Sequence, residues 1–166
     1  MNTIKEIALE VAKNVLEESK RYYKQKLVSF VIFGSVARDR VTPESDLDIL
    51  IIVEDLPQGR TKRVFDFQEN IEKKIERKLI ALHRKGINLF LSPIIKTPQE
   101  VKTGSPLFLD MLEFSIILYD KDEFFKRYLK ELKIKLKKLG SKKIVSGNAW
   151  YWILKPDYRY GDVIEL

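Results

Sequence analysis

The stretch Phe30–Val53 reads FVIFGSVARDRVTPESDLDILIIV, two apolar runs joined by a polar loop. The run over 27–33 is short, is rich in β-branched and aromatic residues, and stops at Gly34, which predicts a buried strand. Gly34 lets the chain turn sharply and lets backbone amides approach a ligand closely. If a helical turn begins after Ser35, its free N–H groups and the Ser35 hydroxyl form an anion site, with Arg38 one turn further on. This half of the stretch therefore predicts a phosphate site.

The second apolar run, 46–53, predicts another strand, and side chains two residues apart in a strand point to the same face. Asp46 and Asp48 are therefore expected to point together, while Leu47 and Ile49 enter the core. Two carboxylates held this close raise the pKa of one of them unless a cation lies between them. Oxygen ligands of this kind suit Mg²⁺ or Mn²⁺, which also bridge substrate phosphates.

The order Gly34-Ser35, ten residues, Asp46-Leu47-Asp48 resembles the GSx10DxD signature of minimal nucleotidyltransferases, a branch of the DNA polymerase β superfamily. The flanking letters, G-S-x-A-R and S-D-x-D, agree with that signature. The resemblance implies a nucleoside triphosphate substrate and transfer of a nucleotidyl group, AMP above all, to a hydroxyl. It implies two sets of site residues: Asp46 and Asp48 as catalytic metal ligands, and Gly34, Ser35, Arg38 and Ser45 for the triphosphate.

That family places a third carboxylate in the middle of the next strand, and here the next apolar run is 87–95. Asn88 is its closest match, and a neutral amide oxygen is a weaker metal ligand than a carboxylate. This departure puts catalytic competence in question unless another acid completes the site. The sequence leaves three candidates open: Glu69, Asp110 and Glu113. Pro93 within the run predicts a bend or an edge strand.

The rest of the chain alternates helical and strand patterns. Helices are predicted over 3–25, 60–85, 106–113 and 121–139, with a helix start at 97–100, a strand over 114–119, and a hairpin of 142–145 with 149–154 around Ser146-Gly147-Asn148. We expect an α/β fold of the nucleotidyltransferase type, a small mixed sheet flanked by helices, with a C-terminal helix and hairpin extension. Residues 1–120 would form the nucleotidyltransferase domain and 121–166 the extension packed on it.

Composition narrows the classes of protein. A chain of 166 residues with 45% apolar content predicts one folded domain, and the absence of cysteine excludes disulfides and a thiol nucleophile. The single histidine, His83, lies near a predicted helix end, where a structural role is favoured over catalysis. No apolar stretch resembles a signal peptide or membrane span, so a cytoplasmic protein is expected. High lysine and glutamate content is typical of proteins from hot environments.

The net charge of +7 is concentrated near the C-terminus, where 126–143 holds nine lysines or arginines and one acid. Such a basic face attracts a nucleotide polyphosphate, an acidic protein or nonspecific nucleic acid, although a solvated helix face is an equally good interpretation. The aromatic run Trp150, Tyr151 and Trp152 could stack a base, but alternation in a hairpin favours covering a core.

Three functions compete at this point. The first is a metal-dependent nucleotidyltransferase, and small members of the resembled family imply a HEPN-type ribonuclease toxin as the protein that carries the acceptor hydroxyl. The second is a binding module that keeps the nucleotide pocket and acts by contact with RNA or a protein, which Asn88 favours. The third, modification of a cationic antibiotic, is disfavoured by the basic surface. A homodimer stays open.

Overall fold

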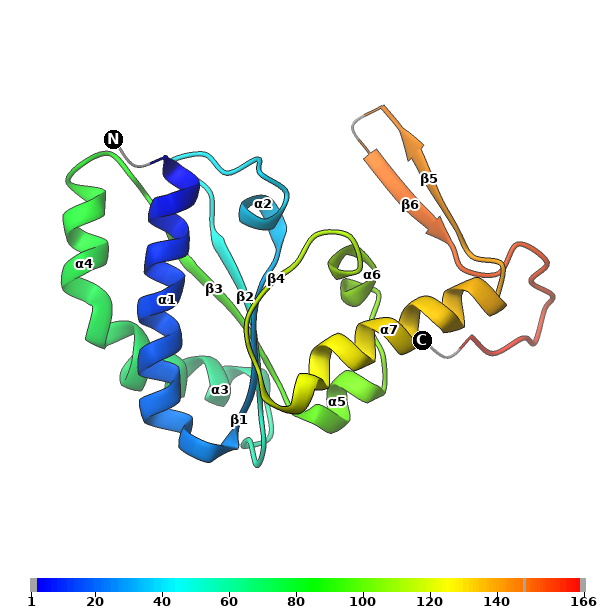
Figure 1. The fold of residues 1–166 in the computed structure, drawn as a ribbon, viewed down its shortest axis with the longest axis horizontal. Helices are drawn as coiled ribbons and strands as arrows, with labels where there is room; N and C mark the ends of the chain where they lie inside the picture. The colour runs from blue at the N-terminus through cyan, green and yellow to red at the C-terminus, as the bar shows by residue number, and fades with distance from the viewer. Residues whose placement is uncertain (1–2, 148, 165–166) are drawn as a thin grey trace.

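The computed structural model describes residues 3–147 and 149–164 and is built around a four-stranded sheet in the order β3-β2-β1-β4 (Figure 1). β1 pairs antiparallel with β2 and β4, and β2 pairs parallel with β3, so the sheet is mixed. The strands are β1 (Leu27–Ile32), β2 (Leu47–Val53), β3 (Leu91–Lys96) and β4 (Ile116–Asp120). The predicted mixed α/β fold is confirmed.

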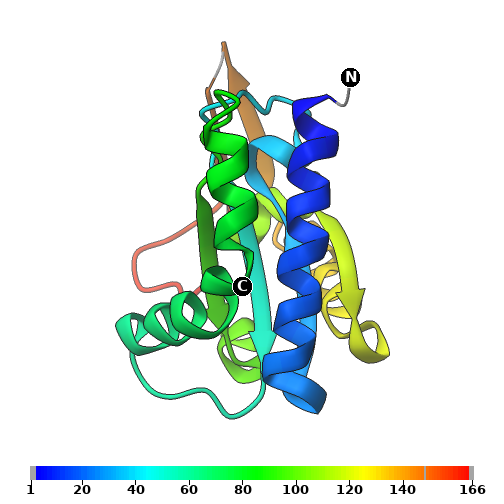
Figure 2. The ribbon, with the colours of Figure 1, turned by 90° about the vertical axis from the view of Figure 1, so that its left-hand side faces the viewer.

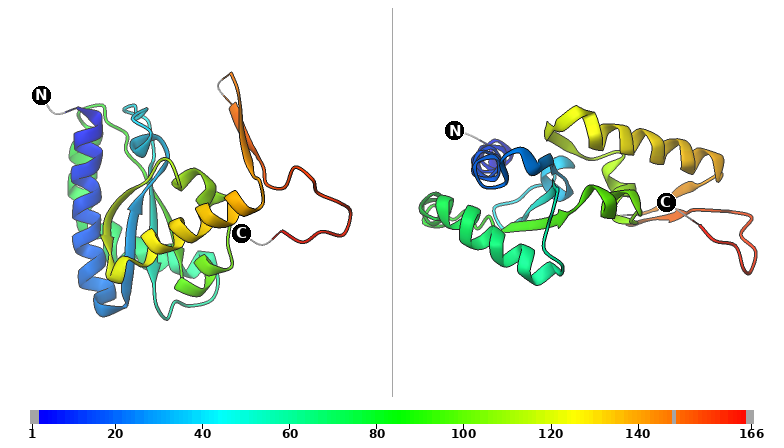
Figure 3. Two further views of the ribbon diagram at one scale, coloured as in Figure 1. Left: turned by 45° about the vertical axis from the view of Figure 1, so that its right-hand side comes forward. Right: turned by 90° about the horizontal axis from the view of Figure 1, so that it is seen from below.

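Helices cover both faces of the sheet, and Figure 3 shows the resulting layers from below. One face packs against α1 (Ile4–Tyr23), α3 (Arg60–Phe67) and α4 (Lys73–His83), and Figure 2 shows α1 and α4 side by side in front of the strands. The other face packs against α5 (Pro98–Lys102), α6 (Leu107–Met111) and α7 (Phe124–Lys138). None of the described helices is long and apolar enough to cross a membrane.

Alternation along β2 decides which way its side chains point. Leu47 and Ile49 are fully buried against the α1 side, as the sequence predicts, and Leu50 and Ile52 are fully buried against the α7 side. Since Asp48 has the parity of Leu50 and Ile52, its carboxylate belongs to the α7 face. The predicted metal ligands therefore lie on the side of the sheet that the C-terminal part of the chain covers.

The predicted helix over 60–85 is interrupted by a π-helical turn, η2 (Gln68–Glu72), and bends there (Figure 2). Phe67, Ile71 and Ile75 are all buried on the α1 face although they are spaced by four, which is wider than the α-helical period. A π turn accommodates the wider spacing and is a known cause of helix bends. Residues near the end of the predicted range, after His83, form turns.

The third strand starts later than the sequence predicts. The strand is expected from residue 87, whereas β3 begins at Leu91 and residues 87–90 have no regular secondary structure. The Asn88 N–H donates to the carbonyl of Pro43, 2.7 Å away in the loop before β2, instead of entering the sheet. The position predicted for a third carboxylate is thus outside the strand.

β3 is an edge strand, as Pro93 indicated. Because the Leu47 N–H donates to the Phe90 carbonyl at 2.8 Å, alternation along β3 turns the backbone nitrogen of Pro93 away from β2. Proline can occupy this position because no ladder hydrogen bond is lost there. The outward carbonyl of Ile95 accepts a hydrogen bond from the Arg63 guanidinium at 3.2 Å.

The carboxylate of Asp120 caps the start of α7, the helix predicted over 121–139. It accepts hydrogen bonds from the N–H groups of Phe125 and Lys126 at 2.9 and 3.0 Å. A 3-10 turn, η3 (Lys121–Glu123), intervenes, so α7 begins at residue 124 and not at the predicted 121. Beyond α7, strands β5 (Lys142–Ser146) and β6 (Ala149–Ile153) form the predicted hairpin, whose turn residue Asn148 lies outside the described residues.

Candidate active site

The turn after β1 and the carboxylate of Asp48 are in direct contact. Gly34 opens the single helical turn α2 (Gly34–Ala37) with a φ of +67°, a conformation that glycine adopts without strain. A Cβ atom at this position would lie 1.9 Å from Asp48 Oδ2. The Phe33 N–H also donates to the backbone carbonyl of Asp48 at 3.1 Å. Glycine is needed at position 34 because the carboxylate occupies the space a side chain would need.

The two aspartates differ in environment. Asp46 is exposed, and Asp48 is half-buried. Burial raises the pKa of the Asp48 carboxyl above its ordinary value, the charge of Asp46 raises it further, and a hydrogen bond from Ser92 opposes the rise. The donor chemistry fits a divalent cation bound through two carboxylates, with water and phosphate oxygens as its other ligands.

Ser92, and not Asn88, faces Asp48. The parallel register of β2 and β3 sets Asp48 opposite Ser92, so both side chains lie on the α7 face. The Asn88 Oδ1 atom is buried without a hydrogen-bond partner among the described residues. Asn88, the closest sequence match to the third ligand position, therefore does not lie opposite Asp48. β3 begins four residues later than the sequence predicts, so the residue opposite Asp48 lies four positions further along the chain.

The other acids proposed for the third position are engaged elsewhere. Asp110 pairs with Arg38, Glu113 pairs with Lys143, and Glu69 pairs with Lys73 on the far helix. Within residues 3–147 and 149–164 there is no cluster of three or more histidine, cysteine, aspartate or glutamate side chains that could hold a metal ion. Asp48 is the acid that lies against the Gly34 turn, and Asp46 is near enough for its charge to act on the Asp48 carboxyl.

The remaining predicted phosphate residues lie in the loop between β1 and β2. The Ser35 carbonyl accepts a hydrogen bond from the Arg40 N–H at 2.9 Å, which closes the loop onto α2. The Ser45 hydroxyl accepts one from the Thr42 N–H at 2.9 Å and so shapes the turn that leads into β2. Arg38 lies at the end of α2, where Trp150 and Asp110 contact its guanidinium.

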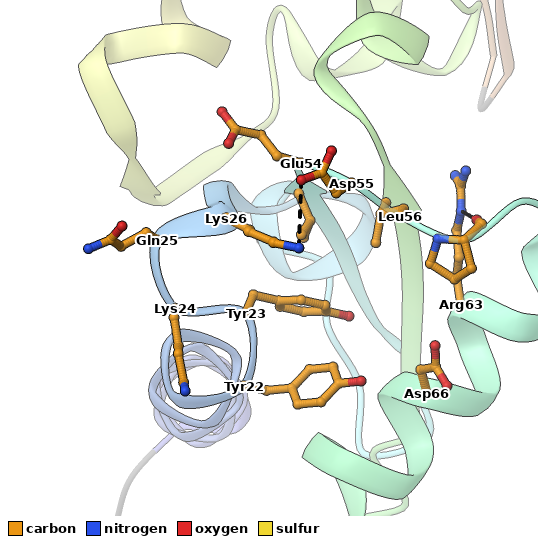
Figure 4. Close-up of a pocket in the computed structure, with 12 residues that line it drawn as sticks. Tyr22, Tyr23, Lys24, Gln25, Lys26, Glu54, Asp55, Leu56, Arg63 and Asp66 are labelled. Carbon is orange, nitrogen blue, oxygen red and sulfur yellow. Dashed lines mark hydrogen bonds and ion pairs between the residues drawn. The ribbon is translucent and has the colours of Figure 1, made fainter.

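A cavity lies at the end of the sheet opposite to the Gly34 turn, where β1 begins and β2 ends. It has a volume of about 580 Å³, and Figure 4 shows Tyr22 and Tyr23 on one wall with Asp66 and Arg63 across from them. It contains none of the predicted site residues. No sequence motif marks this cavity, and Ser92 was also missed because its place opposite Asp48 depends on how β3 pairs with β2. His83 is exposed at the end of α4, away from the aspartates.

Comparison with known families decides the class of the protein. A family model described as a nucleotidyltransferase domain matches residues 12–105, which include Gly34, both aspartates and Ser92. The chain belongs to the nucleotidyltransferase family. The family prediction is confirmed, and this nucleotidyltransferase extends beyond the matched region through α7 and the hairpin.

Two relatives come from Methanocaldococcus jannaschii. The nucleotidyltransferase is 33% identical over 138 residues to the protein named "Putative protein adenylyltransferase MJ1305", covering 78% of this chain and 86% of the relative. It is 29% identical over 105 residues to "Putative protein adenylyltransferase MJ0141", covering 63% of this chain and 91% of that relative.

Two solved structures are also similar to the nucleotidyltransferase. A chain from a toxin–antitoxin complex with AMP-PNP is 14% identical with a TM-score of 0.44, over 78% of this chain and 92% of that one. A chain from a complex of the tri-AMPylated Shewanella oneidensis HEPN toxin with MNT antitoxin is 12% identical with a TM-score of 0.46, over 78% and 87% of the two chains.

Proposed function

We propose that this nucleotidyltransferase transfers AMP from ATP to a hydroxyl group on a partner protein. The observation that supports the proposal is the contact of Asp48 with Gly34, because the carboxylate proposed to bind the metal lies against the turn expected to hold the triphosphate. The 33% identical relative named as a protein adenylyltransferase supports AMP as the group and a protein as the acceptor.

The residues have separate tasks in this reaction. The backbone N–H groups and hydroxyl of the Gly34–Ser35 turn bind the β- and γ-phosphates, and Asp46 and Asp48 hold Mg²⁺ or Mn²⁺. The bound cation supplies charge neutralisation at the phosphates. The acceptor hydroxyl loses its proton to water as its oxygen forms a bond to the α-phosphorus. The bond from that phosphorus to the oxygen that bridges to the β-phosphate breaks, and pyrophosphate leaves. Ser92 helps to keep the carboxyl of Asp48 ionised through its hydrogen bond.

Transfer of label from ATP tests the proposal. ATP labelled on its α-phosphate is incubated with Mg²⁺ and a HEPN-type protein, the acceptor implied by the sequence resemblance. The rate at which label is transferred to that protein is measured for the wild type and for Asp48→Asn. We expect the substitution to lower the rate by about a hundredfold or more, because a preorganised charge at the reacting phosphate is lost.

Asp55→Asn is the matched control. It makes the same change in an exposed aspartate just beyond the other end of β2, so it should leave the rate within about twofold of the wild type. Transfer that survives Asp48→Asn, or that needs no divalent cation, would contradict the proposed function.

A second function is favoured by Ser92, which occupies the position beside Asp48 where an acid would complete the site. A chain with two carboxylates could bind MgATP, act on its partner by contact, and transfer AMP slowly or not at all. Binding of MgATP by calorimetry without label transfer to any acceptor would support this binding module over the enzyme.

A further inference from the structure

The guanidinium of Arg38 is enclosed by the C-terminal half of the chain. Its Nη2 atom lies 3.1 Å from Asp110 Oδ2, and its central carbon lies 4.1 Å from the ring centre of Trp150 and 4.9 Å from that of Phe114. Its side chain is only 15% exposed. The group thus has an ion pair and two aromatic faces, contacts that suit the planar arginine head.

Asp110 joins this arginine to the hairpin. Its Oδ1 atom accepts a hydrogen bond from the Trp150 indole N–H at 2.8 Å while its Oδ2 atom pairs with Arg38. A second link is the ion pair of Lys143, on β5, with Glu113. Arg38 therefore lies at the contact between the α2 turn and the hairpin, and moving it toward a phosphate would break the contacts that hold Trp150 in place.

Arg40 is in a different situation. Its N–H is bonded to the Ser35 carbonyl at 2.9 Å, so its backbone is tied to the turn that we expect to bind triphosphate. Its side chain is exposed and has no ion pair within the described part of the chain. It lines a pocket of about 310 Å³ together with Arg38, Lys143 and Trp150, at the side of α2 that faces the hairpin.

We propose that Arg40, and not Arg38, is the arginine that binds the β- and γ-phosphates, and that Arg38 is a positioning residue that holds the β5–β6 hairpin against the α2 turn. The inference rests on the proposed function, because it takes ATP as the ligand. Arg40 has a side chain free to form charge-assisted hydrogen bonds with phosphate oxygens. Arg38 acts through Trp150, which lines the pocket, and through Asp110, which accepts a hydrogen bond from the Trp150 indole.

Nucleotide titrations test the part of the proposal that concerns Arg40. The dissociation constants of ATP and AMP are measured by calorimetry with Mg²⁺ for the wild type, Arg40→Gln and the control Arg127→Gln, which removes an exposed arginine from α7. We expect Arg40→Gln to weaken ATP binding about tenfold, the effect of one charge-assisted contact, and to leave AMP binding unchanged. The control should change neither constant by more than about twofold.

Fluorescence tests the part that concerns Arg38. In a Trp152→Phe background Trp150 is the single tryptophan of the 166-residue chain. Arg38→Gln should shift its emission to the red and raise its quenching by acrylamide, while ATP affinity falls by less than about threefold. Arg40→Gln should leave the emission unchanged. Arg38→Lys keeps the charge but lacks the planar head, so it should restore the emission only in part.

Three results would overturn the assignment. The first is an ATP affinity that falls further with Arg38→Gln than with Arg40→Gln, and the second is Trp150 emission that Arg38→Gln does not move. The third is an ATP affinity that Arg40→Gln leaves unchanged. This result alone decides the assignment if the Arg38→Gln variant does not fold. Wild-type protein that binds no MgATP would refute the proposed function together with this assignment, whereas wild-type binding with a silent Arg40→Gln refutes the assignment alone.

Discussion

At the scale of single residues, Gly34 controls the distance between the turn and the carboxylate of Asp48. Its φ of +67° is costly for any residue with a Cβ, and a Cβ would also lie 1.9 Å from Asp48 Oδ2. Backbone strain and steric overlap are separate effects. A second glycine, Gly86, separates them because it has a φ of +78° with nothing within 4 Å of the position of its Cβ.

We therefore predict that Gly34→Ala abolishes label transfer and destabilises the protein by more than Gly86→Ala does. The strain alone should cost about 1–2 kcal/mol in each variant. Urea denaturation gives the free energy of unfolding for both. Equal destabilisation, or a Gly34→Ala variant with normal transfer, would show that the carboxylate does not press on the turn.

A second residue-scale prediction concerns the third ligand position. Ser92→Asp adds a carboxylate opposite Asp48 and should raise the affinity for Mn²⁺, since a third oxygen anion joins the site. Asn88→Asp should leave Mn²⁺ affinity unchanged and lower stability, because the Asn88 Oδ1 atom is buried without a partner in the described part of the chain and a charge there would be costly. Calorimetric Mn²⁺ titration distinguishes the two. A gain with Asn88→Asp and none with Ser92→Asp would restore the sequence prediction.

These residues also show what the sequence could and could not predict. The adjacency of Asp46 and Asp48 follows from the period of a strand, and the glycine turn follows from one interrupted apolar run, so both were within reach of local rules. Ser92 was not within reach of local rules, because the register of two parallel strands depends on the path of the long connection between them. The pairing of Arg38 with Asp110 joins residues 72 positions apart and left no local pattern.

At the scale of elements, α7 packs one face of the sheet with an aromatic cluster. The ring of Tyr128 lies 5.2 Å from Phe108 and 6.0 Å from Phe125, centre to centre, and its hydroxyl is buried without a partner among the described residues. Burial raises the pKa of Tyr128 from its ordinary value to about 12. Burial also raises the pKa of Tyr23, beside α3.

This packing predicts how stability depends on pH. Because the folded state holds the Tyr128 proton more tightly than the unfolded state, the free energy of unfolding is intact below pH 10 and falls as the pH rises toward 12. Tyr128→Phe should reduce this loss of unfolding free energy at high pH by up to roughly 2 kcal/mol. At pH 7 it should leave the free energy of unfolding nearly unchanged. Urea denaturation from pH 7 to 11.5 measures it, with the exposed Tyr158→Phe as control. A control variant that flattens the curve equally would rule out Tyr128 as the cause.

The elements differ in how well local pattern predicts them. Helix α1 and strands β1 and β2 lie within one or two residues of their predicted bounds, because hydrophobic period and glycine stops act locally. The π turn at Gln68–Glu72 was missed because spacing by four also fits an α-helix over a few turns. The basic face of α7 is exposed, so its contact with nucleic acid stays a prediction.

At the scale of the whole molecule, a hydrophobic core lies on each face of the sheet. The C-terminal helix α7 supplies much of the core on one face. Phe125, Leu132 and Leu136 of α7 are buried in the same cluster as Val31 of β1 and Leu50 of β2. Residues 12–105, which match the family, lack this cover for the α7 face. We infer that 121–166 folds together with 1–120 and is required for its stability.

The free edge at β3 has a consequence for how the molecule behaves in a crowded solution. Pro93 presents no donor outward, and the Ile95 carbonyl is already taken by Arg63. A strand from another molecule could pair with this edge only by hydrogen bonding to its outward backbone groups. At two neighbouring outward positions one has no donor and the other has an occupied acceptor. The pair thus opposes fibril growth by strand addition, at a border that would otherwise be open to it.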